Sequence, residues 1–131
     1  MIDRVDHLVL TVASVPATIE FYRRVLSLEA QEQNGRWSLH FGTQKLNLHP
    51  AEKPFEPKAR FPQPGSSDFC LITRMSEEEI IEHLESRGIL IEEGPVTRIG
   101  ALGPMTSVYF RDPDGNLVEV ATYSVQNVNR I

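Results

Sequence analysis

An internal repeat constrains the fold of this chain more than any other feature of its sequence. Apolar positions in the first half recur 61 residues later, and towards the end of each copy the offset grows to 69. The matched pairs are Leu8 with Phe69, Leu10 with Leu71, Ile19 with Ile80, Leu28 with Ile89 and, at the larger offset, Phe41 with Phe110. Self-similarity of this kind indicates two copies of one supersecondary unit.

Each copy is predicted to contain one strand, one helix and three further strands. In the first copy, alternating residues predict a strand over 5–12, and apolar residues at helical spacing predict a helix over 15–26. The other strands predicted for this copy are 28–33, 36–41 and 45–49, with Asn34-Gly35 as a hairpin turn. The second copy is predicted to have a strand over 67–73, a helix over 76–87 and strands over 89–92, 107–110 and 117–123.

These elements predict an α+β fold of two tandem βαβββ modules, whose strands form a curved mixed sheet around a cleft. Module one covers about residues 4–50, and module two covers about residues 66–123. The stretch 51–65 between them holds four prolines and is predicted to be a linker over the surface. With 131 residues, the chain is expected to form a single domain.

Composition excludes several classes of partner. The net charge is −5 and no basic stripe is present, which argues against binding to nucleic acid or to an anionic membrane. No apolar run approaches the roughly 20 residues that span a bilayer, and the first residues lack a signal-peptide pattern. The single cysteine, Cys70, lies in an apolar run and is expected to be a small buried hydrophobe in a reducing compartment. We therefore expect a cytoplasmic protein.

A tight turn near the end of the chain carries the first hint of function. Asp112-Pro113-Asp114-Gly115-Asn116 joins two predicted strands. On the second of them, Glu119 shares a face with Leu117 and Ala121. A carboxylate between valines on a strand either faces water or points into a cavity where it has a role.

The sequence resembles the vicinal oxygen chelate superfamily, also called the glyoxalase, bleomycin-resistance and dioxygenase family. The resemblance covers about residues 4–123 and rests on three stretches, which are 5–12, 18–26 and 110–119. It implies paired modules around a cleft that holds one divalent metal ion, with nickel, zinc, manganese, iron and cobalt as the candidates.

The resemblance also implies which residues hold the metal. A first-strand histidine and a last-strand glutamate are typical ligands, and they correspond to His7 and Glu119. The remaining position of module two corresponds to Asp68, where several members have histidine. In module one the choice is between Asn47, which is in register with Glu119, and His49, which lies two residues further on the same face. Histidine is the stronger ligand for transition metals, which favours His49.

The implied function is a metal-dependent enzyme, a lyase or isomerase similar to glyoxalase I that acts on a small polar substrate. Glu119 is the candidate for moving a proton. Asp68 in place of histidine argues against a true glyoxalase I, whose substrate is a glutathione hemithioacetal. The alternatives are a fosfomycin-modifying transferase or hydrolase, a dioxygenase, and a metal-free dimer that sequesters a small ligand.

Two further expectations concern the surroundings of this site. A curved sheet leaves open edges that a second copy would cover, so we expect a homodimer. Residues 94–106 form the main insertion of module two and are expected to be a mobile flap over the cleft. Arg98 and Tyr109 border this insertion, and together with Asn47 they are candidates for contact with the substrate.

Overall fold

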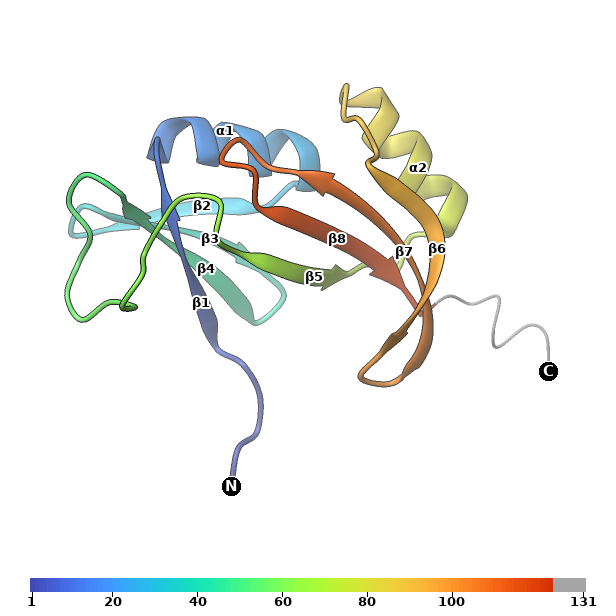
Figure 1. Ribbon diagram of the computed structural model, residues 1–131, viewed down its shortest axis with the longest axis horizontal. Helices are drawn as coiled ribbons and strands as arrows, with labels where there is room; N and C mark the ends of the chain where they lie inside the picture. The colour runs from blue at the N-terminus through green and yellow to red at the C-terminus, as the bar shows by residue number, and fades with distance from the viewer. Residues whose placement is uncertain (124–131) are drawn as a thin grey trace. The chain divides into compact units, whose positions relative to one another are not determined.

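The fold consists of two βαβββ modules, each with its own four-stranded sheet, as the computed structural model in Figure 1 shows. The structure describes residues 1–123. Contacts between residues divide the chain into two compact units. Unit 1 contains Met1–Ser67 together with the turn Asp112–Asn116, and unit 2 contains Asp68–Arg111 and the chain from Leu117 onward. The predicted α+β fold of two modules is confirmed.

In module one, helix α1 packs against one face of a mixed sheet. The elements are β1 (His7–Val12), α1 (Val15–Leu26), β2 (Glu29–Gln33), β3 (Arg36–Phe41) and β4 (Gln44–Pro50). The strand order is β1-β4-β3-β2, and only β1 and β4 run parallel. Leu10, Leu46 and Leu48 point towards the helix side and are 1% exposed each, and Tyr22 and Val25 of α1 are fully buried. This core leaves the opposite face of the sheet, here called the open face of the module, free of a helix (Figure 1).

Module two repeats this arrangement. Its elements are β5 (Asp68–Ile72), α2 (Glu77–Ser86), β6 (Glu93–Gly100), β7 (Gly103–Arg111) and β8 (Leu117–Thr122). The strand order is β5-β8-β7-β6, with β5 and β8 parallel. Its core contains Ile80 and Leu84 from α2, and Val108, Phe110 and Val118 from the sheet. Within residues 1–123, no helix is long and apolar enough to cross a membrane.

The two modules also pair their strands in the same register. In module one, Val9 of β1 lies opposite Asn47 of β4. In module two, Cys70 of β5 lies opposite Glu119 of β8. Val9 and Cys70 are 61 positions apart, which is the repeat offset in the sequence. The repeat therefore extends from the order of elements to the pairing of individual residues.

The helices begin and end where the local sequence indicates. The Ser14 side chain accepts a hydrogen bond from the Ala17 amide at the start of α1, and Ser27 takes a left-handed conformation at its end. At the start of α2, Ser76 and Glu79 form a capping box.

The segment expected to be a flap is instead an antiparallel hairpin. Strands β6 and β7 pair from Glu93 opposite Tyr109 to Gly100 opposite Gly103. No strand forms over 89–92. The strand predicted over 89–92 was therefore wrong, and the paired strands within 94–106 were missed because the glycines and prolines of that segment were taken as loop markers. An edge strand tolerates proline at a bulge, and Pro95 lies at the register shift between Glu93 and Val96.

The Asp112–Asn116 turn is tied to the end of the linker and to β1 and α1. Asp112 is 6% exposed, and its carboxylate accepts hydrogen bonds from the amides of Asp114 and Asn116, from the Asn116 side chain and from the Tyr22 hydroxyl. Asp114 accepts a hydrogen bond from the Ala13 amide, and Asn116 accepts one from the Ser67 amide. Every polar side chain of the motif is therefore used to hold the turn in place.

Candidate functional site

The candidate site residues of module one lie on its open face. Leu46 and Leu48 of β4 face the core, so the residues between and beside them face the other way. The side chains on this face are His7, Val9 and Thr11 from β1, and Lys45, Asn47 and His49 from β4. All three module-one candidates, His7, Asn47 and His49, thus share one surface.

His7 is held through one ring nitrogen. Its Nδ1 lies 2.9 Å from Oδ2 of Asp6, and its side chain is 44% exposed. The hydrogen bond to His7 holds the pKa of Asp6 below its usual value. A carboxylate that binds Nδ1 orients the imidazole and directs Nε2 towards a ligand, which is the usual arrangement of a metal-bound histidine. Asp6 was not among the residues singled out from the sequence.

The strand register distinguishes Asn47 from His49. His7 lies opposite Lys45, and His49 lies opposite Thr11, which is four residues further along the sheet. Four residues of a parallel strand span about 13 Å. Two side chains anchored that far apart reach one ion only if both extend fully towards each other. Asn47 is displaced from His7 by only two residues, so the register favours Asn47 as the neighbour of His7.

His49 is instead embedded at the other end of the face. It is 8% exposed, and its ring meets the ring of Phe55 edge-on, with 5.2 Å between the centroids. Burial, aided by the charge of Arg36, lowers the pKa of His49, so the imidazole is neutral at neutral pH. Its Nδ1 is buried and has no hydrogen-bond partner within residues 1–123.

In module two, Glu119 lies on the open face between a thiol and a phenol. Its cross-strand neighbours are Cys70 on β5 and Tyr109 on β7. One carboxylate oxygen, Oε2, is buried and has no hydrogen-bond partner in the described part of the chain. Asp68 lies on the same face at the start of β5 and is exposed. A buried carboxylate oxygen without a donor is the kind of atom that a bound cation or a proton donor satisfies.

Cys70 is exposed, which contradicts the prediction of a buried hydrophobe. The reason is its position, because residues 68, 70 and 72 of β5 face away from α2. Burial of the sulfur atom, with the nearby Glu119 carboxylate, raises the pKa of Cys70 to about 12. The group beside Glu119 is therefore a neutral thiol at neutral pH.

A row of polar side chains leads from Glu119 through Tyr109 and Arg98 to Glu93 on the edge strand β6. Nε of Arg98 donates a hydrogen bond of 3.1 Å to the Tyr109 hydroxyl, and Nη2 of Arg98 donates one of 3.1 Å to Glu93. Burial raises the pKa of Tyr109, Arg98 opposes this shift, and the Glu119 carboxylate adds to it. Two substrate-contact candidates of module two, Arg98 and Tyr109, are thus brought together beside Glu119.

The two modules place their candidate ligand residues at equivalent strand positions. His7 and Asn47 occupy in module one the positions that Asp68 and Glu119 occupy in module two, because each pair starts at the first strand residue and is displaced by two along the partner strand. Within residues 1–123, no three side chains of His, Cys, Asp or Glu form a ready metal cluster. The orphaned oxygen of Glu119 and the oriented imidazole of His7 nevertheless fit a divalent ion in chemical type.

Comparison with known families agrees with this arrangement. Residues 4–120 match the model of the Glyoxalase/Bleomycin resistance protein/Dioxygenase superfamily. The chain belongs to this superfamily. The match covers both modules, and it includes His7, Asn47, Asp68 and Glu119.

Individual relatives are similar over most of the chain. Virulence protein STM3117 from Salmonella typhimurium is 50% identical over 124 residues, which are 94% of this chain and 86% of the relative. Its crystal structure superposes with a TM-score of 0.93, covering 95% of this chain and 99% of that one. Glyoxalase domain-containing protein RDO1 from Mycosarcoma maydis is 49% identical over 90% of this chain and 67% of its own length.

A more distant structure carries the name of an enzyme. Lactoylglutathione lyase from Agrobacterium tumefaciens is 26% identical, with a TM-score of 0.70 and coverage of 92% of this chain and 93% of that one. The fold is therefore shared with a lyase.

Proposed function

We propose that this protein is a metal-dependent enzyme of the lyase or isomerase type that acts on a small polar substrate chelated to a divalent metal ion. The observation that carries this proposal is the matched register of the two modules. Because of this register, the pair His7 and Asn47 occupies the same positions on the open face of module one as the pair Asp68 and Glu119 occupies on that of module two. Similarity to a named lactoylglutathione lyase supports the reaction type.

In this proposal His7 and Glu119 are the principal ligands, and Asn47 and Asp68 complete the set. A divalent ion bound there polarises adjacent oxygens of the substrate as a Lewis acid. Imidazole and carboxylate donors suit nickel, zinc, manganese, iron and cobalt alike. Asp6 keeps the His7 ring in place through Nδ1.

The protein groups around Glu119 suit proton transfer. Oε2 of Glu119 has no hydrogen-bond partner among the described residues, so it is available to accept a proton from a substrate carbon next to a carbonyl group. The Tyr109 hydroxyl accepts a hydrogen bond from Arg98 and interacts with the Glu119 carboxylate, so it can donate to the substrate in place of Glu119. The neutral Cys70 thiol adds no second negative charge beside the base.

The test is metal content and turnover of purified protein and matched variants. His7→Ala and Glu119→Gln should each lower metal affinity by at least about 100-fold, because each removes a ligand, and should abolish any metal-dependent turnover that the wild-type protein shows. Asn47→His should raise metal affinity, because imidazole is the stronger donor. Glu82→Gln, an exposed change on α2, is the control and should leave both unchanged.

His49 separates this proposal from the ligand set that the sequence favoured. His49→Gln should retain the metal, because that side chain lies about 13 Å along the sheet from the level of His7. Loss of metal in His49→Gln with retention in Asn47→Ala would refute the ligand set. A wild-type protein that binds none of the five metals would refute the enzyme proposal as a whole.

A second candidate function is metal-free binding of a small ligand. It is favoured by one feature, which is that module one offers the weak ligand Asn47 where module two offers Glu119. This candidate predicts ligand affinity that is unchanged by Glu119→Gln.

We also propose a homodimer. Each sheet has two edge strands, β1 and β2 in module one and β5 and β6 in module two. Uncovered edges favour pairing with a second copy. Light scattering coupled to size-exclusion chromatography tests this, and a monomer with full metal content and turnover would contradict it.

A further inference from the structure

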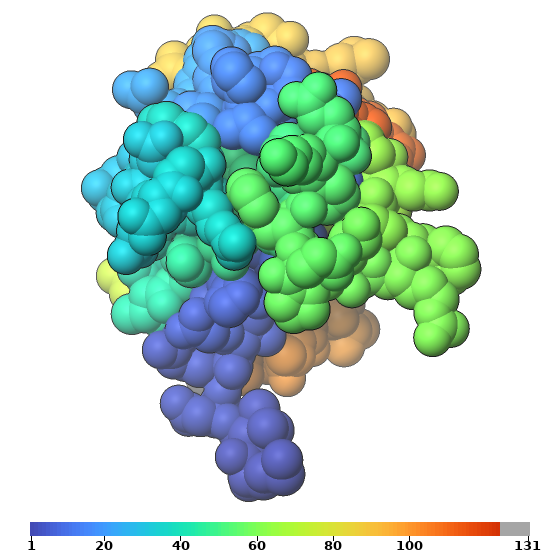
Figure 2. Space-filling view, turned by 90° about the vertical axis from the view of Figure 1, so that its left-hand side faces the viewer, coloured from blue at the N-terminus to red at the C-terminus, as the bar shows by residue number. Residues whose placement is uncertain are grey.

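A pocket on the open face of module one combines two cations with hydrogen-bond donors. Its volume is about 540 Å³. Its lining includes Arg36, Ser38, Lys45, Asn47, His49 and Phe55. Figure 2 shows the hairpin of β2 and β3 in cyan and the linker in green on this side of unit 1, and these two segments supply opposite walls of the pocket.

The pocket is positively charged, whereas the chain as a whole is negatively charged. The protein carries 18 acidic side chains and a net charge of −5. No Asp or Glu is among the residues that line the pocket, while Arg36 and Lys45 both are. Within residues 1–123, neither cation has a carboxylate partner within 4.0 Å. Two cations on one concave surface, neither in a salt bridge with a carboxylate, attract an anion.

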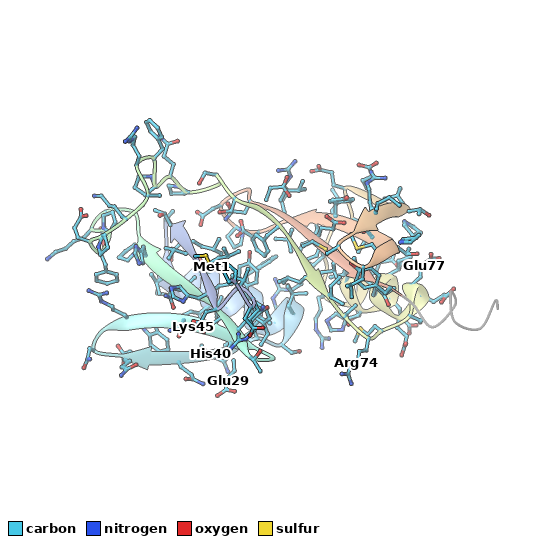
Figure 3. All side chains as sticks on the ribbon, turned by 90° about the horizontal axis from the view of Figure 1, so that it is seen from below. Met1, Glu29, His40, Lys45, Arg74 and Glu77 are labelled. Atoms are coloured by element: carbon cyan, nitrogen blue, oxygen red, sulfur yellow. The ribbon has the colours of Figure 1, made fainter. Side chains whose placement is uncertain are left out.

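The nearest carboxylates on this face are already engaged. Asp6 is bound by His7 at 2.9 Å. Glu29 lies at the far edge of the sheet, beyond His40, and accepts a hydrogen bond from Gln31. Figure 3 labels Lys45, His40 and Glu29, which follow one another across β4, β3 and β2. The hydrogen bond from His7 is the main cause of the lowered pKa of Asp6, and the charge of Lys45 adds to it. Within residues 1–123, Lys45 forms no salt bridge, so its ammonium group can still contact a ligand.

The pocket is also built in advance. The Arg36 guanidinium lies over the ring of Phe55, 4.2 Å from its centroid, and this ring meets His49 edge-on. Stacking restricts the long arginine side chain while leaving its N–H groups free to donate. Ser38 adds a buried hydroxyl, which lies 2.8 Å from Nε2 of His40.

Asn47 links this pocket to the proposed metal site. Its position in module one matches that of Glu119 in module two, so a neutral amide stands where the other module has a carboxylate. A carboxylate there would repel an anion in the pocket. An amide both offers an oxygen to a metal and donates N–H groups to an anion.

We propose that this pocket binds the anionic group of a small organic ligand, a carboxylate or a phosphoryl group, through Arg36 and Lys45, with hydrogen bonds from Ser38 and Asn47. The inference deepens the proposed function, because it makes the substrate a small organic anion whose charged end lies beside the metal-chelated end. It does not depend on a bound metal.

The test is binding of simple anions to the metal-stripped, ¹⁵N-labelled full chain at constant ionic strength. The probes are inorganic phosphate and acetate, with acetamide as the neutral counterpart of acetate. Phosphate or acetate should shift the side-chain N–H signals of Arg36, Asn47 and the pocket residue Trp37, and acetamide should not. The tighter of the two anions identifies the group as phosphoryl or carboxylate.

Charge variants decide whether the pocket itself is the site. Arg36→Gln and Lys45→Gln should each weaken anion binding about 10-fold, because each removes one charge-assisted contact. Arg24→Gln, on the exposed side of α1, changes the net charge equally and should have no effect. Equal weakening by Arg24→Gln, or unchanged affinity in both pocket variants, would overturn the proposal.

The metal affinity of Arg36→Gln should equal that of wild type, because Arg36 is not a proposed ligand. Anion binding in a protein that binds no metal would support the pocket and refute the metal proposal. Metal binding without anion binding would refute the pocket proposal and leave the metal proposal standing.

Discussion

The hydroxyl of Tyr22 donates a 2.7 Å hydrogen bond to Oδ2 of Asp112, a residue 90 positions away in the chain. Tyr22 is fully buried and Asp112 is 6% exposed. Burial, together with the charge of Asp112, raises the pKa of Tyr22, so its hydroxyl remains a donor at all physiological pH values. This bond joins α1 to the turn whose sequence most clearly marks the superfamily.

Tyr22→Phe should lower the free energy of unfolding by about 1.5–3 kcal/mol, because it leaves a buried carboxylate short of one donor. Urea denaturation measures the change. Tyr123→Phe is the matched control, since its hydroxyl accepts a hydrogen bond from the Leu102 amide at an exposed turn. Its effect should be smaller, and equal losses in the two variants would contradict the role assigned to Asp112.

Cys70 should react slowly with iodoacetamide despite its exposure. With a pKa of about 12, its thiolate fraction at pH 8 is about 10³-fold below that of an ordinary cysteine, and only the thiolate reacts. Glu119→Gln removes one cause of the raised pKa and should accelerate alkylation. The rate is followed by mass spectrometry of the intact protein. A wild-type rate equal to that of a model thiol would show that Cys70 does not lie beside the Glu119 carboxylate.

Glu79 should make stability depend on pH in the acid range. Hydrogen bonds from the backbone and side chain of Ser76 hold the pKa of Glu79 below its ordinary value of 4.5. A carboxyl group with a lowered folded-state pKa stabilises the protein above pH 4.5, and this contribution is lost as the pH falls through the folded-state value.

Glu79→Gln should therefore be less stable than wild type at pH 7, and the difference should shrink towards pH 3. Chemical denaturation at the two pH values provides the measurement. Glu78→Gln removes the same charge from the same turn but lies outside the capping box, so its stability should follow the wild-type pH dependence more closely. A pH-independent difference for Glu79→Gln would argue against the capping box.

The hairpin of β6 and β7 should resist hydrogen exchange. Its ladder pairs Val96 with Ser107, Thr97 with Thr106 and Ile99 with Pro104. Amides of a paired ladder exchange more slowly than those of a mobile flap. Exchange monitored by NMR should show protection in this hairpin relative to the linker, residues 51–65. Tyr123→Phe should selectively accelerate exchange at Leu102, whose amide donates to the Tyr123 hydroxyl. Rapid exchange throughout 96–107 would instead support the expectation of a mobile flap.

The sequence determined the order of elements in module one, the two helices and the faces of the outer strands of each module. The repeat predicted two βαβββ modules, and the spacing of apolar residues predicted α1, because helical periodicity and strand alternation are local properties. Glu119 was assigned to the strand face on which the structure has it, since alternation alone decides which side chains share a face.

Only the tertiary structure decided which residues are neighbours. The parallel pairing of β1 with β4 put Asn47, and not His49, near the level of His7. The pairing of β5 with β8 put the exposed thiol of Cys70 beside Glu119, and the β6–β7 ladder turned the expected flap into a hairpin. Register and cross-strand contacts arise from the pairing of segments far apart in the chain. The free energy of that pairing depends on both segments at once, so the local pattern of either one does not contain it.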